Sequence, residues 1–161
     1  MPLSALSLSS AEAVGTGLSL TLTGGALAIS APSAADLGSV TANASGSVLS
    51  AQIGDVVVID DRAAAGGSGW VATAISSAFT PVSGATIPAS NVAYSAGSIA
   101  LTGTVTAHDN DPLSLTGVSA VVTASAITGS NTATWNPTLT ISIPGSRVAG
   151  VYTATITHSV S

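Results

Sequence analysis

Side chains that could carry acid–base or nucleophilic chemistry are few in this chain of 161 residues. Its two histidines are His108, which opens a polar loop, and His158, which lies on the apolar face of a stretch with a period of two. Packing explains such a histidine better than a role as a base. Serine is abundant, but no G-x-S-x-G turn is present to activate one, and cysteine is absent. The sequence therefore predicts a protein that is not an enzyme.

Hard oxygen ligands gather in one short segment, HDND at residues 108–111. Asp109, Asn110 and Asp111 offer carboxylate and amide oxygens, which are the ligands that calcium prefers. The same residues ahead of Pro112 also form an ordinary turn by bonding to their own backbone, and their spacing departs from the EF-hand loop. A turn is the favoured interpretation and a calcium site is the alternative. We expect no other cofactor.

Both signs of charge occur together in Asp60, Asp61 and Arg62, directly after an apolar run. An arginine can clamp a carboxylate with two parallel hydrogen bonds. We interpret this cluster as a structural ion pair that holds the following loop, with contact of Asp61 and Arg62 to a ligand as the alternative.

Trp70 and Trp135 are the largest side chains in a sequence that is only 3% aromatic. Indole rings stack on sugars and fill peptide pockets, but a sandwich this poor in aromatic residues also needs them as core anchors. Core or edge packing is the favoured interpretation for Trp135. For Trp70 both interpretations stay open, because the glycine-rich residues 66–69 before it could present the ring to a ligand.

The composition excludes two classes of partner. Charged residues make up 6% of the chain, against roughly 25% in ordinary soluble domains. Lysine is absent, and two arginines face seven acidic residues, so the net charge is -5. A basic surface that tracks phosphates cannot form, which excludes nucleic acid. No apolar run approaches the roughly 20 residues of a membrane-spanning helix, so we expect no membrane span.

Alternation of apolar and small polar residues, punctuated by glycine and proline, runs through most of the chain. Such a pattern predicts about ten β-strands and no convincing helix, although a short helix would also satisfy residues 35–42. We therefore expect an all-β fold, a two-sheet antiparallel sandwich of immunoglobulin-like or jelly-roll topology. One domain is expected over residues 1–161, with residues 1–17 as a loosely ordered segment.

Several strands can be placed individually. Residues 18–23 and 26–30 flank Gly24-Gly25 and predict a hairpin, and residues 36–42 and 47–52 predict another pair. The β-branched run at residues 55–60 is expected to be a central strand that is buried on both faces or crosses the core. Residues 150–161 alternate strongly, so they predict a strand that is paired inside a sheet, with His158 on the apolar face.

Three stretches resemble a known family: VVVIDDRAAAGGSGWVATAISSAFTP, ATIPASNVAYSAGSI and TWNPTLTISIPGSRVAGVYTATITHSVS. Their order is similar to the WxL-type cell-surface domain of Gram-positive bacteria, in a divergent variant from high-GC species. The resemblance runs from about Asp55 to the last residue. Trp70-Val71-Ala72 and His158-Ser159-Val160 would take the places of the two signature motifs. The resemblance implies export, a β-sandwich and noncovalent attachment to the cell wall, with peptidoglycan as the partner.

The sequence thus predicts a secreted, noncatalytic protein of the cell wall or extracellular space. Its expected partner is cell-wall glycan or another surface protein, through Trp70, Asp61, Arg62 and His158. The alternative is a structural subunit of an extracellular fibre or surface layer, which self-associates through strand edges. A threonine-rich surface that binds ice or a crystalline polymer is a third interpretation. We expect an export leader of about 15 to 30 residues ahead of residue 1.

Overall fold

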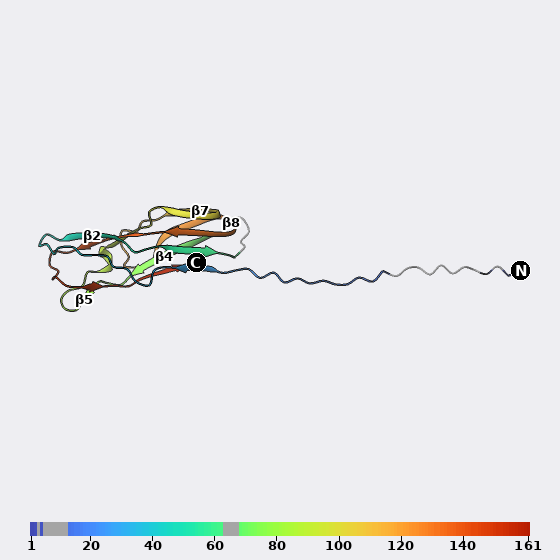
Figure 1. Ribbon diagram of the computed structural model, residues 1–161, viewed down its shortest axis with the longest axis horizontal. Coiled ribbons are helices and arrows are strands. Elements are labelled where there is room, and N and C mark those ends of the chain that lie inside the picture. Colours follow the sequence, from blue (N-terminus) through green and yellow to red (C-terminus); the bar gives the residue numbers. More distant parts are fainter. Residues whose placement is uncertain (3, 5–12, 63–67) are drawn as a thin grey trace.

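The computed structural model describes residues 1–161 except residue 3, residues 5–12 and residues 63–67. A flattened body of strands carries a long extended N-terminal segment at one end (Figure 1). The expectation of an all-β fold is confirmed, and the one helical element among the described residues is a short 3-10 turn. The elements are β1 (Leu27–Ser30), β2 (Ser47–Gln52), β3 (Val56–Asp60), β4 (Ser68–Ser76), β5 (Thr80–Pro81), η1 (Ala89–Asn91), β6 (Val92–Ser95), β7 (Ile99–Asp109), β8 (Ser119–Trp135), β9 (Thr138–Ile143), β10 (Tyr152–Thr153) and β11 (Ile156–Val160).

The larger sheet is built on β8, which is 17 residues long. β7 pairs along one edge of β8. β3 pairs with Asn131–Trp135 and β4 with Ser119–Ile127, so these two strands follow one another along the opposite edge. β1 then adds to β3, and β11 adds to β4. All of these pairings are antiparallel, and the path through the sheet is β1-β3-β8-β4-β11.

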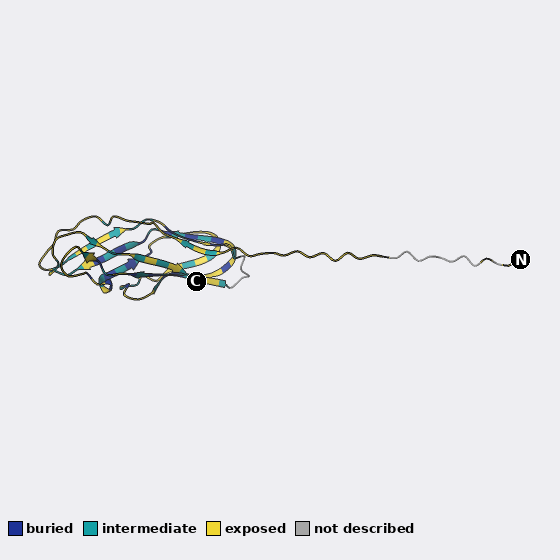
Figure 2. Ribbon diagram, turned by 90° about the horizontal axis from the view of Figure 1, so that it is seen from below, coloured by how far each residue is buried: buried dark blue, intermediate teal, exposed yellow. Residues whose placement is uncertain are grey.

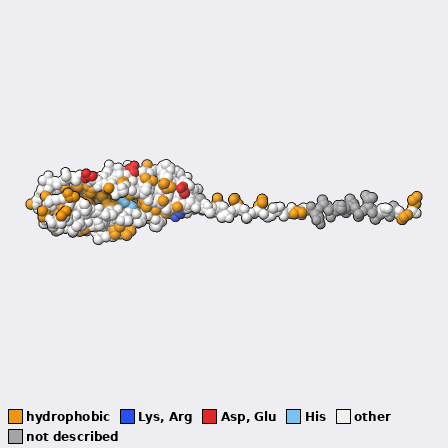
Figure 3. All heavy atoms as spheres, turned by 60° about the horizontal axis from the view of Figure 1, so that its bottom comes forward, with side chains coloured by type: hydrophobic (Ala, Val, Ile, Leu, Met, Phe, Trp, Pro, Cys, Tyr) orange, Lys and Arg blue, Asp and Glu red, His pale blue; other side chains and the backbone are white. Residues whose placement is uncertain are grey.

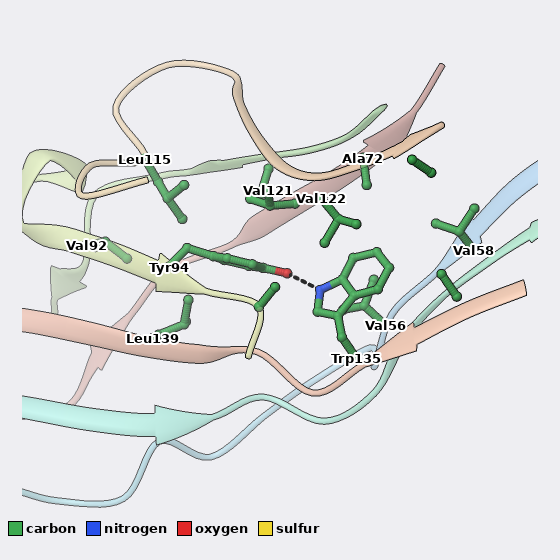
Figure 4. Close-up of a cluster of buried hydrophobic side chains, with 14 of the residues drawn as sticks. Val56, Val58, Ala72, Val92, Tyr94, Leu115, Val121, Val122, Trp135 and Leu139 are labelled. Atoms are coloured by element: carbon green, nitrogen blue, oxygen red, sulfur yellow. Dashed lines mark hydrogen bonds between the residues drawn. The ribbon is translucent and has the colours of Figure 1, made fainter. Parts of the chain in front are cut away.

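A smaller sheet of order β2-β9-β6 packs against the first, and a two-stranded piece pairs β10 with β5. The side chains buried between the sheets are mostly valine, alanine, leucine and isoleucine. Larger aromatic side chains stand among them, and the Trp135 indole donates a hydrogen bond of 2.8 Å to the Tyr94 hydroxyl (Figure 4). The two-sheet antiparallel sandwich expected from the alternation is therefore present, with many small side chains around a few aromatic anchors.

The run at residues 55–60 is an inner strand, as expected, because β3 lies between β1 and β8. Only one of its faces is fully buried, however: Val56, Val58 and Asp60 point into the core, while Ile59 is exposed. The face of β3 that carries Ile59 is turned away from the core and toward solvent, which explains the difference. The expectation of burial on both faces is wrong.

The strand at the C-terminal end of the sequence is paired, as predicted. β11 pairs with β4 through Ile156 to Val160, and Ser161 exchanges two backbone hydrogen bonds with Val71. Its alternation places Ile156, His158 and Val160 toward the interior and Thr157 and Ser159 outward. The stretch divides before it reaches this sheet, because Tyr152 and Thr153 pair with β5 instead.

The two predicted local hairpins are wrong. Residues 18–23 form no strand and run extended and exposed, and β1 pairs with β3. Gly24-Gly25 makes no hairpin turn, because the Gly25 N–H donates to the Asp61 carbonyl oxygen at 2.9 Å. A Cβ on Gly25 would clash with Asp61 at this close approach. Residues 36–42 also form no strand, and β2 pairs with β9. In both cases the strand pairs with a strand that is distant in the sequence and not with the segment directly before it.

The N-terminal segment is exposed along its described length (Figure 2). Residues 13–17 lie clear of the body, residues 1, 2 and 4 are exposed as well, and the other residues of the expected loosely ordered segment, 3 and 5–12, fall outside the described residues. Among the residues that the structure describes, no helix is long and apolar enough to cross a membrane.

Candidate functional site

A large apolar cleft of about 750 Å³ opens on one side of the sandwich. It lies between the edges of the two sheets, with β2 and β9 on one side and β10 and β11 on the other. Figure 3 shows a hollow in the body with hydrophobic side chains gathered in it. The apolar side chains that form its floor and walls include Leu37, Leu49, Phe79, Leu139, Ile141 and Ile156.

Residues 31–43, which we call the strap, cross this side and complete the lining. The strap begins where Pro32 packs over Gly54. A Cβ on Gly54 would lie 2.7 Å from Pro32 Cγ, and its φ of +95° also favours glycine. Residues 31–42 make no backbone-to-backbone hydrogen bond to either sheet among the described residues, although the Ser47 hydroxyl of β2 donates to the Thr41 carbonyl oxygen at 2.8 Å. The strap therefore covers part of the cleft but does not pair with either sheet as a strand.

Both strands beside the cleft are edge strands. In the part of the chain that the structure describes, β2 pairs only with β9, and β11 pairs only with β4. Leu49 from β2 and Ile156 from β11 line the cleft, so each strand turns an apolar side chain toward it. An edge strand offers unpaired N–H and C=O groups to another chain. The cleft thus combines an apolar floor with free backbone hydrogen-bonding groups.

His158 stands in the wall of the cleft, where a chain of hydrogen bonds leads into the core. Its Nε2 lies 3.1 Å from the Tyr94 hydroxyl, which already accepts the Trp135 indole N–H. Because an indole only donates, the Tyr94 proton is free to point at His158, whose Nε2 then accepts. Burial lowers the pKa of His158 and raises that of Tyr94, so both groups stay neutral at pH 7.

The ion pair expected after the apolar run is present, with Asp60 as the acid. Arg62 Nε and Nη2 donate to the two carboxylate oxygens of Asp60 at 2.9 and 3.0 Å. The same Nη2 also donates to the Gly69 carbonyl oxygen at 3.1 Å, which links Arg62 to the start of β4. The Arg62 side chain holds the pKa of Asp60 below its usual range. Asp61 is exposed, and its backbone groups hold Gly25 and Ala26.

Trp70 is buried in the core, with 2% of its surface exposed. It lies on the inward face of β4, and its indole N–H points to the Asn131 side-chain oxygen at 3.4 Å. The period of two in β4 dictates this placement, because Ala72 and Ala74 share the same face. Of the two interpretations left open for Trp70, the structure supports the core anchor. Trp135 is buried as well, as expected.

Asp109, Asn110 and Asp111 lie at the end of β7, where two of the three side chains bond within the fold. Asp111 Oδ1 accepts the Ala96 N–H at 3.0 Å, and Asn110 exchanges hydrogen bonds with the Thr123 hydroxyl. The turn is thus held by neighbouring strands rather than by its own backbone. No group of three or more potential metal-ligating histidine or acidic side chains occurs in the described ranges.

The sequence-predicted site residues do not come together. His158 alone lines the cleft; Arg62 and Asp61 lie beside the end of β3, Trp70 is in the core, and residues 109–111 are in a separate loop. The strap and the floor of the cleft were missed, because their residues read as ordinary strand and loop segments. The alternation predicts a paired strand at residues 18–23, and only the fold shows that Leu18, Leu20 and Leu22 are exposed.

No family model matches the chain, and neither does any curated protein or any solved structure. Function is therefore inferred from the described residues themselves.

Proposed function

We propose that this protein is a noncatalytic structural subunit of an extracellular assembly, and that it self-associates by strand addition. The observation that carries the proposal is the extended N-terminal segment. Leu18, Leu20 and Leu22 are 93%, 92% and 90% exposed, although their spacing places all three on one face of a strand. Ser19, Thr21 and Thr23 occupy the opposite face.

An exposed row of leucines in a strand pattern is costly unless another surface covers it. Burying one leucine side chain is favourable by about 1.5–3 kcal/mol, and such exposed apolar rows mark interaction sites. The segment has the composition of a sheet strand but makes no pairing in its own body. A partner sheet would supply an apolar surface for the leucine side chains and hydrogen-bonding groups for the backbone of the segment.

The edges of the sheets favour the same mode of association. Natural proteins blunt exposed edges with lysine, proline or bulges, and this chain contains no lysine. β7 does carry register shifts around Gly103, which interrupt its outer edge. β2 pairs with β9 without a register shift, and β11 pairs with β4 in the same regular way, so both edges remain suitable for another strand.

The noncatalytic assignment is supported by the chemistry of the cleft. Its ionisable lining side chains are Asp36, Arg147, Tyr152 and His158, and burial lowers the pKa of His158. The hydroxyl beside His158 Nε2 belongs to Tyr94, which is buried and also holds the Trp135 indole N–H, so it is not an accessible nucleophile. Export is supported by the lysine-free, weakly charged composition.

Attachment to the cell wall, which the WxL resemblance implies, stays a second candidate. The resemblance favours it, but a sugar ring cannot stack on Trp70 while that indole is buried. Wall glycan would have to bind at another surface of the body.

The test measures association of the purified full chain by sedimentation velocity over a range of protein concentrations. We expect concentration-dependent oligomers for the natural sequence and monomers for a variant with Leu18→Ser, Leu20→Ser and Leu22→Ser. The matched control carries Val82→Ser, Leu113→Ser and Val118→Ser, which remove three exposed apolar side chains elsewhere.

Unaltered association in the Leu18/Leu20/Leu22 variant would overturn the proposal. A monomeric natural chain that sediments with purified wall sacculi would instead favour wall attachment. The control variant should associate as the natural chain does, because its substitutions lie outside the N-terminal segment.

A further inference from the structure

We propose that the apolar cleft is the acceptor for residues 18–22 of a second copy of this chain. The segment enters as an added strand and places Leu18, Leu20 and Leu22 against the cleft lining. This inference rests on the proposed self-association and names the surface that receives the segment. It joins the exposed row of leucines to the apolar cleft, which the strap covers only in part.

The shapes are compatible. Three side chains at alternate positions of a strand extend over about 14 Å, at roughly 3.4 Å per residue. A cleft of about 750 Å³ can hold several aliphatic side chains, since sites of roughly 300–1,000 Å³ enclose whole drug-sized ligands. β2 and β11 stand at its two sides with unpaired edges. An entering strand therefore finds backbone partners as well as an apolar floor.

The chemistry of the two surfaces also agrees. Residues 13–35 contain no charged side chain, so a strand from this segment brings no unpaired charge into the cleft. The cleft lining includes the apolar side chains of Leu49, Phe79 and Ile141, with Asp36 and Arg147 as its two oppositely charged residues. A segment with many charges of one sign would lose hydration against the apolar side chains, whereas a Leu–Ser/Thr strand would not.

The direction of the chain favours a second copy over self-insertion. β1 runs from Leu27 toward Ala31, where the strap and the cleft begin, and residues 18–22 precede β1. Two backbone hydrogen bonds between Asp61 and Gly25-Ala26 hold the segment beside the end of β3. Figure 1 shows it leaving the body at the end opposite β2 and β5. Entry into its own cleft would require a reversal at Gly24 and a return along β1.

Donor and acceptor are different surfaces at different ends of the molecule. Such a contact is heterologous, and it generates an open filament when repeated without closing into a ring. The strap must shift to admit the strand, and among the described residues the hydrogen bond that its backbone would lose to a sheet is the one of 2.8 Å from the Ser47 hydroxyl of β2 to the Thr41 carbonyl oxygen. The geometry therefore predicts head-to-tail chains of subunits.

The decisive experiment mixes two complementary variants of the full chain. The donor-less variant carries Leu18→Ser, Leu20→Ser and Leu22→Ser, and the acceptor-less variant carries Leu49→Glu in the cleft wall. We expect each variant alone to be monomeric and the mixture to form a one-to-one complex. Val48→Glu is the matched control, because Val48 is the neighbouring residue on the exposed face of β2. It should change the dissociation constant less than twofold, against at least tenfold for Leu49→Glu.

A second measurement covers the case in which Leu49→Glu disturbs folding. A spin-labelled peptide of residues 16–25 is added to the donor-less variant, and NMR signals are followed. Broadening at Leu49, Ile156 and His158 supports the cleft, and a peptide with serine at all three leucine positions should cause none. Broadening confined to β7 would overturn the cleft as acceptor while leaving self-association intact.

The outcomes separate the two proposals. If the natural chain associates through its leucines but the complementary variants do not combine, the acceptor is wrong and the proposed function stands. If the natural chain never associates, both are wrong. A small apolar molecule that copurifies in the cleft and survives in native mass spectra of the assembled chain would also overturn the acceptor assignment.

Discussion

Trp70 contributes to the core through a ring that packs against β8 and an indole N–H that points to Asn131. The glycine-rich residues before it do not lift it out of the sheet. Replacement by alanine would remove the ring and leave the Asn131 oxygen without this partner. Trp70 therefore stabilises the fold, and its substitution would affect the binding of a partner only through the loss of stability.

We predict that Trp70→Ala lowers the free energy of unfolding by roughly 3–5 kcal/mol, as deletion of a buried aromatic ring does. Urea denaturation followed by circular dichroism measures the change. Trp70→Phe keeps most of the packing and should cost less. A Trp70→Ala protein with the melting temperature of the natural chain would contradict the core assignment.

His158 makes stability depend on pH. Burial lowers its pKa below the ordinary 6.5, so the unfolded chain binds this proton more readily than the folded chain. The free energy of unfolding should therefore fall as the pH drops through about 6.5 toward the folded pKa. Protonation would also turn Nε2 from an acceptor of the Tyr94 proton into a donor.

The measurement compares urea denaturation at pH 8 and pH 5. We expect lower stability at pH 5 for the natural chain and a much smaller difference for His158→Gln. His108→Gln serves as the matched control, because His108 is exposed, and it should retain the pH dependence. The Asp60 carboxylate loses its contribution only below its usual pKa of 3.8, outside this interval. An unchanged difference in His158→Gln would exclude His158 as its source.

At the scale of elements, β11 has two roles. It covers the outer edge of β4 and supplies Ile156 and His158 to the wall of the cleft. β10 holds the short β5 in the same region. Loss of these strands would open the core along β4 and remove one side of the acceptor.

We predict that deletion of residues 150–161 abolishes the cooperative thermal transition. The truncated chain should be insoluble or should bind a hydrophobic dye as a partly folded state. Deletion of residues 1–17 is the control and should preserve the transition, since residues 13–17 are exposed and outside the body. A full cooperative melt without residues 150–161 would contradict the integral role of β11.

The whole molecule combines a net charge of -5 with an uncharged donor segment and an apolar acceptor. Like-charged subunits repel one another at low salt, and this repulsion is screened when ions are added. The apolar contact is not weakened by screening, and sulfate strengthens it. Assembly should therefore resist salt, unlike a complex held by ion pairs.

We predict that raising sodium chloride from low concentration to about 0.5 M leaves association unchanged or makes it tighter, because the Debye length falls below about 10 Å. Sedimentation velocity of the natural chain gives the dissociation constant at each concentration. The variant with serine at residues 18, 20 and 22 should stay monomeric throughout. A tenfold weakening in salt would indicate an electrostatic interface instead.

Local pattern was sufficient for much of the fold and little of the site. The alternation in residues 47–52 predicted a strand that exists as β2, that in residues 150–161 predicted the strand β11, and Asp60–Arg62 formed the expected kind of ion pair. The same alternation in residues 18–23 also predicted a paired strand, which the body does not contain. Alternation with a period of two indicates that a segment can form a strand, but it does not indicate whether another strand of the body can pair with it.

The sequence by itself determined the class of the protein: a weakly charged, lysine-free chain with period-two alternation folds into sheets, because this property resides in each short segment. Only the tertiary structure decided which strands pair, since β2 joins β9 and β1 joins β3 across long separations. It also decided that Trp70 faces inward and that a cleft remains between β2 and β11. These outcomes depend on the sum of contacts between segments far apart in the chain, which no single stretch encodes.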